Sequence, residues 1–219
     1  MQLQRGASSP EKATVSLLVI LLLSLLSVSA LLLFFPEAES TAPGSISLVS
    51  HIPQVLGAVY LYKKLWGLNS RMLRLQPSRK DSVEAFAVGA GLGLLFAYLS
   101  PQSFSGTRPV ALSLILGLRQ FFLVAVPEEM LFRGFYLRAL SESMPLRFSI
   151  GVSSLAFALF HFGNLLAGAD LPEVTVQVII AALTGTLFGL QYVRGGLIPP
   201  ILSHGALNFF LVISRTFFR

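Results

Sequence analysis

Two adjacent glutamates in the second half of the chain have the side chains best suited to acid–base chemistry. Glu128 and Glu129 follow Pro127 in a largely apolar stretch, and Arg133 lies four residues after Glu129. Residues four apart share one face of a helix, so the spacing predicts an ion pair between Glu129 and Arg133 and leaves Glu128 free to point elsewhere. Burial beside a second acid adapts a carboxyl group to general acid–base catalysis. The alternative is an interfacial cluster in which both glutamates face water and the arginine extends to the headgroups.

Two histidines in the same half of the chain add further reactive groups. His161 lies four residues after Phe157 in an apolar block, and His204 precedes Asn208 by four, which places imidazole and carboxamide on one helix face. Taken singly, each histidine is also explained as a hydrogen-bonded core residue. Together with the glutamates they offer a base that activates water and donors for a developing oxyanion. The third histidine, His51, lies in the first half and is interpreted as structural or path-lining.

The elements that position these residues are predicted to be membrane helices. The chain has 219 residues, of which 54% are hydrophobic and 12% charged, against about 25% charged in soluble domains. Its mean hydropathy is +0.75. Because lipid requires backbone polar groups to be satisfied internally, and no period-two alternation occurs, the predicted fold is all-α, a polytopic transmembrane bundle of about six to eight spans. The apolar blocks extend approximately over 15–35, 46–62, 85–100, 110–126, 148–167, 174–193 and 197–213.

Charge and cysteine content narrow the function classes. The net charge of +6 comes from residues between the apolar blocks, which predicts topology signals and no nucleic-acid partner. The basic segment 63–80 is expected in the cytoplasm together with the N-terminus. On that topology Arg215 and Arg219 fall outside, against the rule, so one block is re-entrant or one boundary is displaced. Cysteine is absent, which excludes disulfides, thiolate metal sites and a cysteine nucleophile. The first block is interpreted as a retained span, since it is longer than a signal-peptide core.

The order of the polar motifs resembles one known family. EExxFR at 128–133, FxxxH at 157–161 and HxxxN at 204–208 occur on successive apolar blocks. This pattern resembles the CPBP family, which comprises the CAAX prenyl endopeptidases and their bacterial Abi relatives, and the resemblance covers roughly residues 80–212.

The resemblance implies two parts of the chain. Residues 80–219 would form a CPBP-like intramembrane protease core. Residues 1–79 lie before the resemblance and are expected to form N-terminal spans with the basic cytoplasmic loop. The expected location is a bacterial inner or cell membrane, with the lipid bilayer as solvent and a membrane-anchored protein or peptide as substrate. The substrate would be a CAAX protein, a peptide or a C-terminal tail.

The resemblance also implies a metal-independent glutamate mechanism without cofactors. In that mechanism Glu128 and His161 activate the attacking water. His204 and Asn208 stabilise the oxyanion. Glu129 and Arg133 orient Glu128 and hold its helix.

Three alternatives stay open from the sequence. Glu128, His161 and His204 could hold zinc with a water as fourth ligand, although no HExxH motif is present. A non-catalytic immunity or scaffold protein could keep the same fold and use its cavity only for binding. A small transporter would use buried acids and histidines to relay protons, but the inverted repeats typical of transporters are not found.

Overall fold

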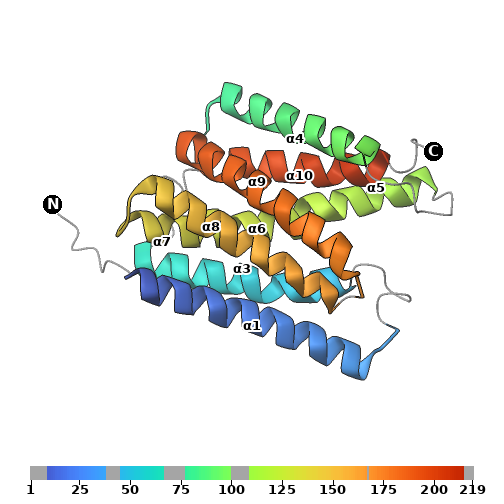
Figure 1. Cartoon of the computed structure of the whole chain (residues 1–219), viewed down its shortest axis with the longest axis horizontal. Helices are drawn as coiled ribbons and strands as arrows, with labels where there is room; N and C mark the ends of the chain where they lie inside the picture. Colours follow the sequence, from blue (N-terminus) through green and yellow to red (C-terminus); the bar gives the residue numbers. More distant parts are fainter. Residues whose placement is uncertain (1–8, 38–44, 67–76, 100–108, 167, 215–219) are drawn as a thin grey trace.

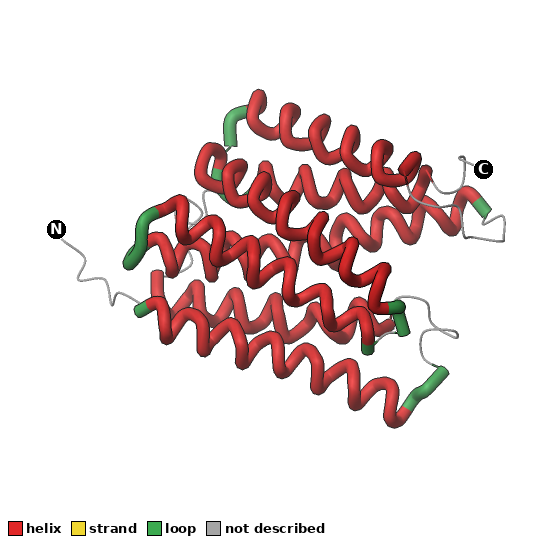
Figure 2. Tube along the Cα trace, in the orientation of Figure 1, coloured by secondary structure: helices red, strands yellow, loops and turns green. Residues whose placement is uncertain are grey.

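The fold is a bundle of helices with no strand in the described part of the chain, which confirms the all-α prediction. The computed structural model describes residues 9–37, 45–66, 77–99, 109–166 and 168–214. Within these ranges seven helical segments lie side by side (Figure 1), and the loops drawn in green in Figure 2 are short. They are α1 (Pro10–Phe34), α3 (Ser45–Trp66), α4 (Arg79–Leu99), the segment Val110–Ser141, α8 (Leu146–Phe160) continued by the 3₁₀ helix η3 (His161–Leu165), α9 (Leu171–Gly195) and α10 (Ile198–Ser214).

The segment Val110–Ser141 is one continuous helix with changing pitch. It is built from α5 (Val110–Arg119), the π-helix η1 (Gln120–Ala125), α6 (Val126–Glu129), the π-helix η2 (Met130–Leu137) and α7 (Arg138–Ser141). The apolar block predicted for this part of the chain covers 110–126, and its C-terminal boundary is wrong, because the helix continues to Ser141. Polar side chains at 127–133 ended the apolar run, but they are buried inside the bundle and the helix continues through them.

Length and surface both indicate a membrane environment. Five of the segments are long and apolar enough to cross a bilayer: α1, α4, Val110–Ser141, Leu146–Leu165 and α9. Large apolar side chains cover the outside of α1, where Leu18, Leu22 and Leu26 are all more than half exposed. Such an apolar surface is stable in lipid and unstable in water. The chain is an integral membrane protein.

The helix ends carry stop and start signals. Asp170 caps α9 by accepting from the Glu173 amide at 2.8 Å. At the other end α9 stops at Gly195, and the capping residue after it is Gly196, whose φ of 78° suits glycine. The chain then reverses within three residues into α10, which extends along the bundle beside α4 (Figure 1). Residues 215 and 219, for which the topology prediction broke the rule, lie outside the described residues.

Close helix packing holds α10 in place. A Cβ added at Gly89 of α4 would overlap the backbone carbonyl of Ser203, and one at Gly93 would overlap the carbonyl of Leu207. Only glycine allows the two backbones to approach this far. The packing fixes the face of α10 that carries His204 toward the interior of the bundle.

Candidate active site

The two glutamates lie on a short α-helical turn between two π-helical stretches. Pro127 has no amide proton, so the turn before it loses a hydrogen bond, and the π-helix η1 ends immediately before α6. π-Helical turns are frequent at functional sites because they re-aim side chains. Glu128 is 4% exposed and Glu129 is fully buried. Both carboxyl groups therefore need protein partners.

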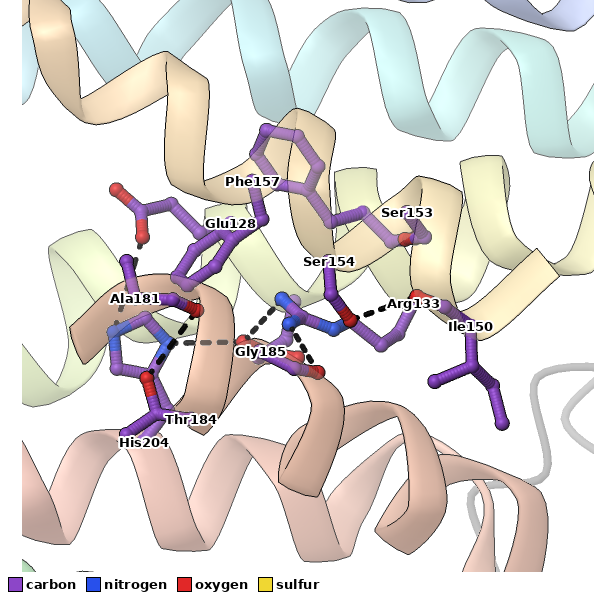
Figure 3. A network of polar contacts seen from close by, with 12 residues as sticks. Glu128, Arg133, Ile150, Ser153, Ser154, Phe157, Ala181, Thr184, Gly185 and His204 are labelled. Carbon is purple, nitrogen blue, oxygen red and sulfur yellow. Dashed lines mark hydrogen bonds and ion pairs between the residues drawn. The ribbon is translucent and has the colours of Figure 1, made fainter. Parts of the chain in front are cut away.

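Arg133 is the main partner of Glu129. Its Nη1 donates to Glu129 Oε1 at 2.9 Å, which is the i,i+4 pair that the spacing predicts. Its Nη2 donates to the backbone carbonyl of Gly185 at 2.9 Å, and its guanidinium lies 4.4 Å from the centre of the Phe157 ring (Figure 3). A side chain at 185 would crowd the guanidinium, since a Cβ there lies 3.1 Å from Nη2. The buried charge pair thus ties the glutamate helix to α9.

His204 connects the two carboxyl groups. Its Nδ1 lies 2.9 Å from Glu129 Oε1, and its Nε2 lies 3.8 Å from Glu128 Oε2 (Figure 3). A carboxylate accepts, so Nδ1 carries the proton of this bond. The ring stacks on Phe188 with centroids 5.0 Å apart. His204 is held from three sides and directs Nε2 toward Glu128.

His51, interpreted above as structural or path-lining, belongs to the same network. Its Nε2 lies 3.1 Å from Glu128 Oε1, and its Nδ1 lies 3.0 Å from the Ser50 hydroxyl. The residue is 7% exposed and comes from α3, far from the other motifs in sequence. The only sequence signal for it was an ionisable side chain inside an apolar block, which indicates function in general but no partner.

His161 and Asn208 lie beside this network without a hydrogen bond to Glu128. His161 begins η3, and its Nδ1 donates to the Phe157 carbonyl at 2.9 Å, so a neutral ring carries its lone pair on Nε2. Asn208 lies one turn after His204 on α10 and is partly buried, and its side chain forms no hydrogen bond with the described residues. Its amide is available to a ligand.

The second oxygen of each glutamate is chemically distinct from the first. Oε1 of Glu128 and Oε1 of Glu129 are engaged, whereas Oε2 of both is buried and has no hydrogen-bond partner among the described residues. With 3.8 Å between them, Glu128 Oε2 and His204 Nε2 are close enough for one water to hydrogen-bond both. The arrangement can therefore orient water against a carboxylate in a site shielded from solvent.

Comparison with known protein families finds a match for the part of the chain that contains both glutamates. Residues 110–210 match the family described as type II CAAX prenyl endopeptidase Rce1-like. These residues are named the Rce1-like domain after that match. No curated protein and no solved structure matches the chain. The family is one of peptidases, and the match confirms the resemblance to the CAAX prenyl endopeptidases.

The Rce1-like domain contains all the residues singled out in the second half of the sequence and omits His51. The matched range begins at residue 110, and the division of the chain at residue 80 stays a prediction. The site is therefore built mainly within the Rce1-like domain, with one histidine from the helices before it.

The zinc alternative requires three converging ligands. Among the described residues, no group of three or more His, Asp or Glu side chains is arranged to hold a metal ion. Glu128, His161 and His204 are not such a group. The hydrogen bonds of His161 and His204 nevertheless use Nδ1 and leave Nε2 of each ring, the nitrogen that could bind a metal, without a hydrogen bond to another described side chain. A chelation experiment below tests metal dependence directly.

Proposed function

We propose that the chain is an intramembrane endopeptidase that hydrolyses a peptide bond of a membrane-tethered substrate. One observation carries the proposal. A buried glutamate of the Rce1-like domain has one oxygen fixed by a histidine. Its other oxygen lies 3.8 Å from a second histidine and has no hydrogen-bond partner in the part of the chain that the structure describes. Such a carboxylate is oriented to accept a proton from water.

In the proposed reaction Glu128 acts as the general base. Its Oε2 takes a proton from a water molecule while the water oxygen bonds to the scissile carbonyl carbon. His161 assists from Nε2, the nitrogen left free by its bond to the Phe157 carbonyl. The tetrahedral intermediate collapses as the carbon–nitrogen bond breaks, and Glu128 returns the proton to the leaving amine. Water is consumed, and Glu128 ends in its starting state.

His204 and Asn208 would stabilise the oxyanion. They lie one turn apart on α10, so both can donate to one oxygen atom. A protonated His204 donates from Nε2, and the Glu129 carboxylate at its Nδ1 compensates the positive charge. Glu129 and Arg133 are positioning residues in this scheme, because they hold His204 and the glutamate helix without touching the substrate.

The substrate class follows from where the site lies. A site buried in a lipid-facing bundle favours substrates that a lipid or an apolar tail already holds at the membrane. Prenylated CAAX proteins fit the family description, and a bacterial peptide or C-terminal tail fits the same chemistry.

We propose a cytoplasmic N-terminus in a bacterial inner or cell membrane. Basic residues gather at the end of the bundle where α1 begins and α3 ends (Figure 1): Lys12, Lys63, Lys64, Arg79, Lys80, Arg138, Arg147 and Arg194. Asp170 and Glu173 lie at the opposite end. The positive-inside rule places the basic end in the cytoplasm.

The proposed activity is tested in cells that express wild type or Glu128→Gln at matched levels. Glutamine keeps the shape of the side chain but cannot accept a proton. Mass spectrometry of membrane-protein C-termini should find a shortened product only with wild type. Glu84→Gln is the matched control, since Glu84 is an exposed acid on α4 that pairs only loosely with Lys80 at 3.7 Å. Equal products with Glu128→Gln and wild type would favour a non-catalytic binding or immunity protein.

A further inference from the structure

His51 is the polar residue of the site that the Rce1-like domain does not supply. It lies on α3, in the part of the chain before residue 110, and its ring reaches Glu128 from a different helix than His204 does. We infer that His51 is a positioning residue for Glu128, which makes the N-terminal helices part of the catalytic apparatus. This inference rests on the proposed function for its kinetic consequences, but the contact itself can be tested without substrate.

The hydrogen bonds assign protons along a short chain of groups. The Glu128 carboxylate accepts at Oε1, so His51 Nε2 carries the proton of the 3.1 Å bond. A neutral ring then accepts at Nδ1, and the Ser50 hydroxyl 3.0 Å away donates to it. The hydroxyl thereby fixes the imidazole tautomer that can donate to Glu128. Ser50, His51 and Glu128 thus form one directed relay, in which Ser50 donates to His51 and His51 donates to Glu128.

This relay decides which oxygen of Glu128 is available for chemistry. With Oε1 bonded to His51, Oε2 is left facing His204 Nε2. Without His51 the carboxylate can rotate about its terminal torsion, which is broad and soft, and exchange its two oxygens. Holding one geometry in advance lowers the barrier, because no reorganisation is needed when the water is deprotonated.

Helix α3, which carries His51, and its neighbour α1 contact the glutamate helix at other points. The Tyr62 hydroxyl of α3 accepts from Arg138, and the Thr14 hydroxyl of α1 lies 3.0 Å from that of Tyr136. Ala58 of α3 packs in the same buried cluster as Leu131. The N-terminal helices and the Rce1-like domain therefore form one packed body, which is what a positioning contact needs.

The kinetic test uses the purified full chain in lipid nanodiscs with a farnesylated, internally quenched CAAX peptide. His51→Leu should lower kcat about tenfold to a hundredfold, the size expected when a carboxylate loses a donor, with KM nearly unchanged. His51→Gln, whose amide can donate from a similar position, should recover most of that loss. Tyr62→Phe is the matched control, since it removes another polar contact between α3 and the same helix, and should keep the wild-type kcat. Equal kcat for His51→Leu and Tyr62→Phe, or no recovery with His51→Gln, would overturn the inference.

A second measurement separates this inference from the proposed function. Thermal unfolding is recorded for His51→Leu, Glu128→Leu and the double variant, all as full chains. If the contact exists, the double variant loses less stability than the two single losses added together, whereas Tyr62→Phe and Glu128→Leu should add. Failure of wild type to cleave the peptide would count against the proposed function alone. Additive losses for His51 and Glu128 would overturn the positioning role whatever the activity.

Discussion

His204 donates from Nδ1 to the same oxygen of Glu129 that accepts from Arg133, each across 2.9 Å. One carboxylate oxygen thus holds a histidine of α10 and an arginine of η2 together. All three side chains are buried, so each depends on the others for its hydrogen bonds. The geometry of the site depends on this junction as well as on Glu128.

Removing one member of the junction should destabilise the bundle more than removing two. Arg133→Met leaves the Glu129 charge buried with only His204 beside it, and we expect a loss of about 3–5 kcal/mol in the free energy of unfolding. The double variant Arg133→Met with Glu129→Gln removes both charges and should recover part of that loss. Denaturant unfolding in detergent measures both. A double variant less stable than Arg133→Met would show that the unpaired charge of Glu129 does not cause the loss of stability.

A change at this junction should lower the activity even in a variant that still folds. Glu129→Gln keeps the side-chain shape but weakens the acceptor for His204, so the oxyanion donor loses its orientation. We expect kcat for the farnesylated peptide to fall about tenfold or more with KM little changed. Wild-type kcat in a folded Glu129→Gln protein would contradict the positioning role of Glu129.

The close approach of α4 and α10 gives a prediction about glycine. A Cβ at Gly89 would overlap the Ser203 carbonyl, next to His204, whereas a Cβ at Gly91 meets nothing within 4 Å. Gly89→Ala should therefore lower the unfolding temperature and the activity together. Gly91→Ala, two residues along the same helix, should be neutral or stabilising by up to about 1 kcal/mol, as alanine favours helix. Equal behaviour of the two variants would mean that the helices are not packed this closely.

Metal dependence has a direct test. The proposed mechanism uses no metal, so dialysis against a strong zinc chelator should leave hydrolysis of the peptide unchanged. Loss of activity that added zinc restores would instead support the alternative in which Glu128, His161 and His204 are ligands. Metal analysis of the purified protein before and after dialysis provides the control.

The absence of cysteine makes the topology testable with single introduced thiols. Lys64→Cys lies at the basic end of the bundle and Asp170→Cys at the other end. With the N-terminus in the cytoplasm, a membrane-impermeant maleimide added to intact cells should label Asp170→Cys only. Lys64→Cys should react after the cells are made permeable. The opposite pattern would invert the proposed orientation.

The sequence was sufficient for the local relationships and insufficient for the distant ones. The Glu129–Arg133 pair follows from helical spacing, and the helices follow from apolar length, so both could be predicted. The end of the glutamate helix could not be predicted in this way. Its polar side chains are buried and form hydrogen bonds with other helices, and the apolar pattern does not reveal those partners. His51 illustrates the limit most clearly. It lies 77 residues before Glu128 in the sequence, and only packing of α3 on the long helix brings the two together.

The central claim is that Glu128 activates water to hydrolyse a peptide bond in the membrane. The most direct test incubates membranes containing wild type or Glu128→Gln in water enriched in oxygen-18 and identifies new C-termini by mass spectrometry. We predict new termini carrying one heavy oxygen with wild type and with Glu84→Gln, and none with Glu128→Gln. The same labelled termini in the Glu128→Gln membranes would contradict the account.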